Sequence, residues 1–392
     1  MEEPVVVAAC RTAVGTFGGS LKAVSAVDLA EVVLQGLLER LRLSPSEVDE
    51  VVFGHGYPHG CGLNVARLGS QKAGYPVEVP AYVVIKACGS SLKAIELAAQ
   101  AIATGSAEAV VAGGVENMSQ VPHILRYRWG QKLGNGSLED ALLADGLYCT
   151  LAQMHMGATA ENVAKLYGVS RAEQDEFALN SHQKALAACE AGRFEGEIAP
   201  VAISTPQGEG VFRVDESIRA DTSLDRLGRL PAVFIEGGTV TAGNSCPLND
   251  GSAAVLIMSS VKAASLGIRP IARIRSFAAA GVPPDVMGIA PVPATRKALK
   301  RAGLALSDID LIELNEAFAA QSLVVISELG LDSDRVNVNG GAIALGHPVG
   351  ATGAKLTTTL LFEMRRRGVQ FGLVTLCMAG GQGLAVVYEL VE

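Results

Sequence analysis

The segment that decides the fold reads Ala81-Tyr-Val-Val-Ile85, then Lys86-Ala87-Cys88-Gly89-Ser90-Ser91, then Leu92-Lys-Ala-Ile-Glu-Leu-Ala-Ala-Gln-Ala-Ile102. Its first part is a short apolar run, and its last part repeats apolar residues at helical spacing and stops before Gly105. The pattern predicts a buried strand that turns into a helix at Cys88. Because the start of a helix favours an anion, we expect a lowered pKa for the Cys88 thiol and a nucleophilic role. Simple packing in the core is the alternative, and this segment favours neither.

Length and composition limit the fold and the partners. A chain of 392 residues exceeds one ordinary core, so two or three domains are expected. With 44 glycines, 18% charged residues and 5% aromatic residues, the composition favours a large α/β protein with an extensive subunit interface. We therefore expect a homo-oligomer, either a dimer or a tetramer. The net charge of −8 and the lack of a Lys/Arg run argue against nucleic acid as a partner.

The cysteines and the first residues of the chain indicate the cellular compartment in which the protein is expected. The seven cysteines are an odd number without a C-x-x-C pair, which argues against a disulfide framework or a zinc ribbon. Neither a targeting peptide nor an apolar run of membrane-spanning length is visible, so we expect a cytoplasmic protein without a membrane partner. His55-Gly-Tyr-Pro-His59-Gly-Cys61 holds metal-ligand residue types, but its Gly and Pro exclude a helical i, i+4 pair. An interface loop is favoured there, and no metal is expected.

A weak internal repeat organises the chain. The segment 43–54 resembles the segment 304–315, with Val48 and Ile309 separated by 261 residues. The same offset carries Cys88 into Gly346-His347-Pro348-Val349-Gly350. Both halves alternate helices and strands, which predicts mostly parallel sheets with helices on their faces.

The repeat also predicts where related loops lie. The turns at Cys88 and His347 become counterparts at the same end of the two sheets. Cys377 comes directly after a predicted strand at 371–376, and ligands in such folds bind beyond the carboxyl ends of strands. We therefore expect these three side chains to share one site.

Residues 118–250 interrupt the repeat. This segment is rich in polar residues and glycine, and amphipathic helices are predicted at 158–166 and 171–191. We interpret it as an inserted lid or substrate-binding subdomain, with a dimerisation insert as the alternative. The predicted units are 1–117 with 251–270, the insertion 118–250, and 271–392.

Four motifs together resemble those of the thiolase family. They are Cys88-Gly-Ser, Asn315-Glu-Ala-Phe, Gly346-His347-Pro348 and Cys377-Met-Ala-Gly-Gly, in this order. The resemblance covers essentially the whole chain and is greatest to the acetyl-CoA acetyltransferase branch. It implies duplicated α/β halves in an αβαβα layering, with an inserted substrate-binding loop domain.

The chemistry of that family explains the residue types. Its members condense two acyl-CoA molecules in a reversible Claisen reaction or cleave a 3-ketoacyl-CoA with coenzyme A, without a tightly bound cofactor. By the resemblance, Cys88 is the acylated nucleophile, His347 takes its proton and Cys377 moves the α-proton of the second acyl group. Asn315 would hold a water in one oxyanion hole, and the backbone N–H groups of Cys88 and Ala379 would form the other. Asn315 could instead cap a following helix.

The resemblance further implies a set of acyl-CoA and coenzyme A contacts. Arg219 suits the nucleotide end, the apolar members would line the pantetheine tunnel, and Met287 near the acyl pocket would favour short acyl groups. The set consists of Leu147, His155, Met156, Arg219, Phe234, Ala242, Cys246, Leu248, Met287, Ala317 and Phe318.

Several positions depart from the family pattern, namely Ala87, Ser91, Cys246, Pro247 and Ala379. The expected function is acetyl-CoA C-acetyltransferase through an acyl-Cys88 thioester, in fatty acid metabolism and as a homotetramer. A 3-ketoacyl-CoA thiolase for longer or unusual chains is one alternative. A malonyl-thioester condensing synthase is another, which the presence of Cys377 disfavours because decarboxylating enzymes need no such base. The departures also leave open a non-catalytic acyl-CoA or lipid carrier.

Overall fold

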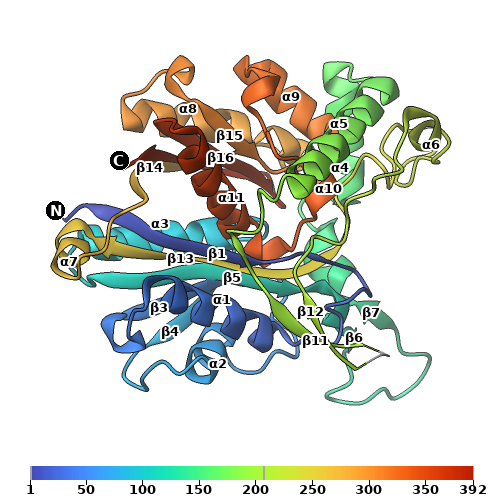
Figure 1. The fold of residues 1–392 in the computed structure, drawn as a ribbon. Coiled ribbons are helices and arrows are strands. Elements are labelled where there is room, and N and C mark those ends of the chain that lie inside the picture. The colour runs from blue at the N-terminus through green and yellow to red at the C-terminus, as the bar shows by residue number, and fades with distance from the viewer. Residues whose placement is uncertain (1, 206–207, 392) are drawn as a thin grey trace.

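Two α/β halves and an inserted segment make up the computed structural model, which describes residues 2–205 and 208–391 (Figure 1). The N-terminal half contains β1 (Pro4–Thr12), β2 (Gly15–Thr16), α1 (Ala26–Leu41), β3 (Glu50–Gly54), α2 (Val65–Lys72), β4 (Ala81–Val84), α3 (Ser90–Ala103), β5 (Ala109–Asn117), β13 (Asn249–Ser259) and α7 (Ser260–Ser265). The C-terminal half contains β14 (Ala272–Gly281), α8 (Pro291–Ala302), β15 (Leu311–Leu314), α9 (Ala319–Leu329), α10 (Ala342–Leu345), α11 (Thr352–Arg367), β16 (Phe371–Met378) and β17 (Gln382–Leu390). Within the described ranges, no helix has both the length and the apolar character needed to cross a membrane.

The two halves repeat one topology. The N-terminal strands lie in the order β4-β3-β5-β13-β1, and the C-terminal strands lie in the matching order β15-β16-β17-β14. The two sets join where Val5 and Val6 of β1 pair with Arg273 and Ala272 of β14. The internal repeat that the sequence predicts is therefore confirmed.

The sheets are mixed, which corrects the prediction of mostly parallel strands. β3 runs parallel to β4 and β5, and β15 runs parallel to β16. By contrast, β13 is antiparallel to β1 and β5, and β17 is antiparallel to β14 and β16. The reason for the last pair is local, because β17 follows β16 through a tight turn in which Gly380 and Gly381 have positive φ.

Five layers result from this topology. In Figure 1, α3 and α11 lie between the two sheets, while α1 and α2 cover the outer face of one sheet and α8 and α9 cover the other. The middle layer is a cluster of buried apolar side chains from α3, α11 and both sheets. The αβαβα layering is therefore confirmed.

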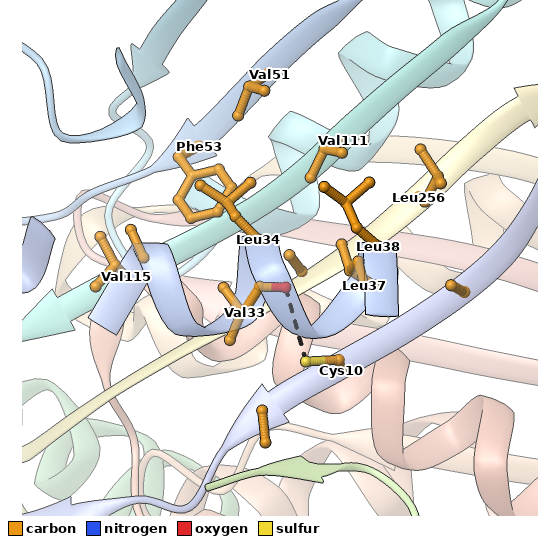
Figure 2. Close-up of a cluster of buried hydrophobic side chains, with 14 of the residues drawn as sticks. Cys10, Val33, Leu34, Leu37, Leu38, Val51, Phe53, Val111, Val115 and Leu256 are labelled. Carbon is orange, nitrogen blue, oxygen red and sulfur yellow. Dashed lines mark hydrogen bonds between the residues drawn. The ribbon is translucent and has the colours of Figure 1, made fainter. Parts of the chain in front are cut away.

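The outer layers form because their helices are amphipathic. Figure 2 shows the α1 side chains Val33, Leu34, Leu37 and Leu38 turned toward strands of the N-terminal sheet, where they meet Phe53 and its neighbours. The spacing of three and four residues places these side chains on one helical stripe. Burying such a stripe removes apolar surface from water, and this is the main source of stability for the layer.

The insertion carries two substantial helices and several short elements. These are β6 (His123–Leu125), β7 (Leu138–Asp140), β8 (Tyr148–Cys149), β9 (Met154–His155), α4 (Met156–Tyr167), α5 (Arg171–Glu190), β10 (Ile198–Ala199), β11 (Val201–Thr205), β12 (Gly208–Phe212) and α6 (Leu224–Gly228). The two helices predicted there are confirmed to within two residues at each end, and a capping box between Ser170 and Glu173 starts α5. The predicted domain boundaries stay a prediction.

A buried arginine fastens the insertion to the N-terminal sheet. Arg11 of β1 is fully buried, and its guanidinium donates to both carboxylate oxygens of Asp215 at 2.8 and 2.9 Å. Its Nε donates to Glu197 at 2.6 Å. Since both carboxylates belong to the insertion, one side chain of the sheet holds two separate parts of it.

We expect Arg11→Ala to lower the free energy of unfolding by about 3–5 kcal/mol, because it leaves two buried carboxylates without their cation. Urea denaturation followed by circular dichroism measures this change. The matched control is Arg229→Ala, since the ion pair of Arg229 with Asp225 is exposed, with side-chain exposures of 76% and 72%. Equal unfolding midpoints for the two variants would contradict the structural role of Arg11.

Candidate active site

Cys88 lies in the turn between β4 and α3, as the sequence predicts. Gly89 is the N-cap of α3, so Cys88 directly precedes the helix start. The Ser90 hydroxyl closes the turn by donating to the Ala87 carbonyl at 2.6 Å and accepting from the Lys86 N–H at 2.8 Å. Ala87 has a φ of +46°, a left-handed conformation that costs a non-glycine residue about 1 kcal/mol or more. The turn thus presents Cys88 at the expense of local strain.

The Cys88 turn packs directly against the end of β16. A Cβ on Gly89 would come within 2.2 Å of the Met378 Sδ, so the Met378 side chain packs closely against this turn. Met378 follows Cys377, which brings the two cysteines into one region. Cys377 lies on β16 itself, because the strand extends to Met378 and not only to residue 376 as predicted.

His347 lies in the loop between α10 and α11 and is held at two points. Its backbone N–H donates to Asn249 Oδ1 at 2.8 Å, and its ring Nδ1 lies 2.6 Å from Thr352 Oγ1. The start of α11 in turn contacts the start of α3, where the Ala354 N–H donates to Ser91 Oγ at 3.0 Å. The loops of Cys88 and His347 therefore precede two helices that are bonded to each other at their first turns, as the repeat predicts.

Asn315 follows β15 at the same edge of the sheet. Its backbone N–H donates to the Thr375 carbonyl of β16 at 3.1 Å, two residues before Cys377. Its side chain is fully buried, and neither Oδ1 nor Nδ2 has a hydrogen-bond partner. The capping alternative is wrong, because Phe318 is the N-cap of α9. An unpaired buried amide is costly, so it fits a group that receives a bound water or an oxyanion.

Burial controls the ionisation of the site. It raises the pKa of the Cys88 thiol to about 12, although the backbone N–H groups of Cys88 and Ala379 act in the opposite direction. The expectation of a lowered pKa is therefore wrong, because desolvation outweighs the helix start. Burial also raises the pKa of Cys377, and it lowers the pKa of His347 to about 3, with a smaller effect from the charge of Lys355. In the free protein the site thus holds neutral thiols and a neutral imidazole at pH 7.

We expect the alkylation of Cys88 by iodoacetamide to increase about tenfold per pH unit between roughly pH 6 and 10. The thiolate is the reacting form, and below a pKa of about 12 its fraction grows in proportion to hydroxide. Mass spectrometry of the Cys88 peptide measures the rate at each pH. A plateau near neutral pH would show a stable thiolate and contradict the neutral state.

Ala379 keeps its place as an N–H donor. Gly380 and Gly381 carry the positive φ angles of the turn, whereas Ala379 does not. A Cβ is therefore compatible with the backbone at this position. The Ala379 N–H is directed at the Cys88 thiol, as its effect on that pKa shows. An N–H donor facing Cys88 is therefore kept at this position in spite of the departure from the family pattern.

Most of the predicted pantetheine contacts surround Cys377. Met156, Met287, Ala317 and Phe318 form one buried cluster with it. Phe234 packs at the edge of this cluster. Its ring stacks on His155 with 4.7 Å between centroids and meets Phe318 edge to face at 6.2 Å. The structure thus brings these residues together into an apolar wall.

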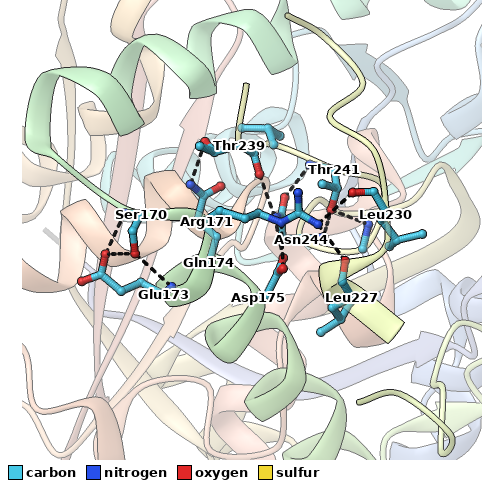
Figure 3. A network of polar contacts seen from close by, with 12 residues as sticks. Ser170, Arg171, Glu173, Gln174, Asp175, Leu227, Leu230, Thr239, Thr241 and Asn244 are labelled. Carbon is cyan, nitrogen blue, oxygen red and sulfur yellow. Dashed lines mark hydrogen bonds and ion pairs between the residues drawn. The ribbon is translucent and has the colours of Figure 1, made fainter. Parts of the chain in front are cut away.

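A pocket of about 370 Å³ contains Arg219 and Ala242, two further predicted contacts. Figure 3 shows how α5 fixes its wall, with Asp175 reaching Asn244 and Arg171 reaching the end of α6. Asn244 Nδ2 donates to Asp175 Oδ1 at 2.9 Å, and Arg171 Nη2 donates to the Leu227 carbonyl at 2.7 Å. Hydrogen bonds from α5 therefore hold two parts of the pocket wall, and charged side chains of the insertion line the pocket.

The remaining predicted contacts take separate positions. Leu147 and Leu248 pack in a different apolar cluster, although Leu248 forms a β-bridge with His347. Cys246 is half-buried, and its N–H donates to the Ala317 carbonyl at 3.1 Å. Cys246 therefore connects the pocket, which Pro247 lines, with the cluster around Cys377.

Three buried polar residues received no role from the sequence. Asn249 and Thr352 hold His347, as described above. Glu116 accepts from the N–H groups of Gly56, Tyr57 and Gly350, which joins the loop after β3 to the loop after His347. One feature of the sequence could have indicated these residues, namely that each is a polar residue in a segment whose other residues are mostly apolar or small. Throughout the described ranges, no group of three or more His, Cys, Asp or Glu side chains could hold a metal ion.

Comparison with known proteins identifies the family. The family described as "Thiolase, N-terminal domain" matches residues 4–261, and "Thiolase, C-terminal domain" matches residues 268–390. The chain belongs to the thiolase family.

Relatives of this thiolase match along its full length. The acetyl-CoA acetyltransferase of Escherichia coli K12 is 51% identical over 391 residues, which is 99% of each chain. The crystal structure of the Bacillus anthracis acetyl-CoA acetyltransferase has a TM-score of 0.98 at 46% identity and covers 100% of this chain and 99% of its own. Human mitochondrial 3-ketoacyl-CoA thiolase has a TM-score of 0.97 at 43% identity with the same coverage. Nothing in these likenesses favours a malonyl-dependent synthase.

Proposed function

We propose that this thiolase is an acetyl-CoA C-acetyltransferase, which converts two acetyl-CoA molecules reversibly into acetoacetyl-CoA and coenzyme A. The observation that carries the proposal is the grouping of the Cys88 turn, Cys377 and the unpaired amide of Asn315 at one edge of the two halves. The names of two relatives that match along the full length support the choice of acetyl-CoA over longer thioesters. Coenzyme A thioesters would enter as substrates, and the reaction needs no further cofactor.

The first half-reaction would acylate Cys88. Its thiol would pass a proton to His347 as the sulfur attacks the acyl carbonyl, and the proton would then leave with the coenzyme A thiol. Because both groups are neutral in the free protein, the proton would move only when the carbonyl arrives to accept the sulfur. A water on Asn315, together with His347, would stabilise the oxyanion, and the buried unpaired amide supports this assignment.

The second half-reaction would form the carbon–carbon bond. Cys377 would first pass its own thiol proton to the neutral imidazole of His347. As the thiolate it would then remove an α-proton from a second acetyl-CoA, and the resulting carbanion would attack acetyl-Cys88. The N–H groups of Cys88 and Ala379 would hold the carbonyl oxygen of the thioester at this step. Collapse would release acetoacetyl-CoA, and the Cys88 thiolate would regain a proton from the His347 imidazolium, which restores the resting state. The pKa of Cys377 is raised in the free protein. A bound thioester must therefore lower the pKa of this thiol, or the thiol must lose its proton as the carbon–carbon bond forms.

Close apolar packing around Cys377 supports the short substrate. Met287 and Met156 are buried against Cys377, with Phe318 closing the same cluster. Longer acyl chains would have to displace these side chains. A 3-ketoacyl-CoA thiolase acting on longer chains is the second candidate, favoured by the likeness to the human enzyme of that name. The dependence of kcat/KM on chain length separates the two.

We expect acetyl-CoA to leave one acetyl group on Cys88, discharged by free coenzyme A, because the acyl-enzyme is an intermediate of both half-reactions. Intact-protein mass spectrometry and peptide mapping locate the adduct, and Cys88→Ala should carry none. Turnover of the wild type equal to that of Cys88→Ala would support a non-catalytic carrier instead.

We expect Cys377→Ala to retain acetylation of Cys88 while losing condensation by about 10²-fold or more, since only the second half-reaction needs this acid/base group. The control is Cys189→Ala, which removes a thiol on α5 outside the cluster around Cys377. Equal losses in the acetylation and condensation assays would contradict the division of roles.

We further propose a cytoplasmic homo-oligomer, a dimer or a tetramer, that acts in fatty acid metabolism. Large apolar side chains in two loop regions support the oligomer, since Leu63, Trp129 and Leu133 are 96%, 93% and 93% exposed. Seven unpaired cysteines support a reducing compartment.

A further inference from the structure

The His347 ring has one engaged nitrogen and one open nitrogen. Nδ1 lies 2.6 Å from the Thr352 hydroxyl oxygen, and both residues are buried. In the part of the chain that the structure describes, no hydrogen bond reaches Nε2. The backbone N–H of His347 is fixed by Asn249, whose amide is itself engaged with Gly15 and Ser217. The ring therefore has little freedom. Whether Nδ1 carries a proton depends on the direction of its hydrogen bond with Thr352.

The hydroxyl proton of Thr352 has an acceptor other than histidine. Thr352 Oγ1 lies 2.9 Å from the carbonyl oxygen of Pro348, four residues earlier, and can donate to it. Its oxygen is then free to accept a hydrogen bond from Nδ1–H. In the opposite arrangement the hydroxyl would donate to Nδ1 and would give up its bond to the Pro348 carbonyl. The first arrangement keeps both hydrogen bonds of the Thr352 oxygen, so it is the favoured one.

We propose that Thr352 is a positioning residue that holds the proton of His347 on Nδ1, so that Nε2 is the nitrogen that accepts the Cys88 proton. The proposal rests on the proposed function only for the identity of that proton donor. The assignment of the tautomer itself follows from the contacts of the free protein.

A hydroxyl orients the ring differently from a carboxylate. A carboxylate at Nδ1 would stabilise the imidazolium form, whereas a neutral hydroxyl fixes the tautomer without adding charge. The surroundings agree, because Lys355 is buried on the same helix and burial lowers the pKa of His347 to about 3. The site therefore retains a neutral base that is oriented before substrate binds.

The decisive variant is Thr352→Val, which keeps the branched shape and removes the hydroxyl. Thr352→Ser restores the hydroxyl and serves as the conservative rescue. Thr358→Val is the matched control, because Thr358 is buried on the same helix and donates to the carbonyl four residues earlier at 2.8 Å without touching a histidine. Any effect of losing such a helix bond appears in this control as well.

The first measurement is 15N NMR of the histidine ring nitrogens in the full-length protein without substrate, with the His347 signals assigned from their loss in His347→Asn. We expect protonated Nδ1 and unprotonated Nε2 in the wild type, in Thr352→Ser and in Thr358→Val. In Thr352→Val the other tautomer should appear. Protonated Nε2 in the wild type would overturn the proposal, and so would an unchanged tautomer in Thr352→Val.

The second measurement is the rate of acetyl-Cys88 formation at saturating acetyl-CoA. We expect Thr352→Val to be about fivefold to tenfold slower than Thr358→Val, as the loss of one neutral hydrogen bond implies, with substrate affinity unchanged. Equal rates in these two variants would overturn the link to catalysis. A wild type that never acquires an acetyl group would refute the proposed function, while the NMR result would still decide the tautomer.

Discussion

The contact between the first turns of α3 and α11 is the constraint on which the site depends. The Ala354 N–H donates to Ser91 Oγ, and a Cβ on Gly353 would come within 2.5 Å of the Leu92 Cβ. The two helices can approach so closely because Gly353 has no side chain where α11 meets Leu92. Because one catalytic loop precedes each helix, this contact fixes the Cys88 turn relative to the His347 loop. The five layers serve to bury these two helices on all sides.

Burial gives the site its chemical character. A thiol at a helix start is expected to ionise readily, yet Cys88 stays protonated because desolvation exceeds the stabilisation by two N–H groups. The imidazole of His347 is neutral for the same reason. Because Cys88 and His347 are both neutral, the N–H groups and the Asn315 amide are not occupied by a charge of the free protein. They remain available for the negative charge that would develop in the proposed reaction. In the proposed reaction such a site would stabilise the transition state more than the free protein.

Three of the five departures from the family pattern fit the contacts and backbone of this chain. Ser91 provides the acceptor between α3 and α11, and Ala379 has a backbone conformation that admits a Cβ. The backbone N–H of Cys246 donates to the Ala317 carbonyl, which places its thiol between the pocket lined by Arg219 and the apolar cluster around Cys377. None of these changes removes a donor or acceptor that the proposed reaction needs. They alter the surroundings of the substrate more than the reacting groups.

The sequence by itself determined the strand, turn and helix around Cys88, the repeat and the two helices of the insertion, and it predicted the four candidate catalytic positions. These follow from local periodicity and from motifs, which depend on neighbours along the chain. Tertiary structure decided the mixed strand directions, the raised pKa of Cys88, the unpaired amide of Asn315 and the contact between Thr352 and His347. Each of these depends on which distant groups meet and on how much water remains between them. Hydrogen-bond partners and desolvation arise only when the two halves close around α3 and α11, so no pattern along the chain could give them.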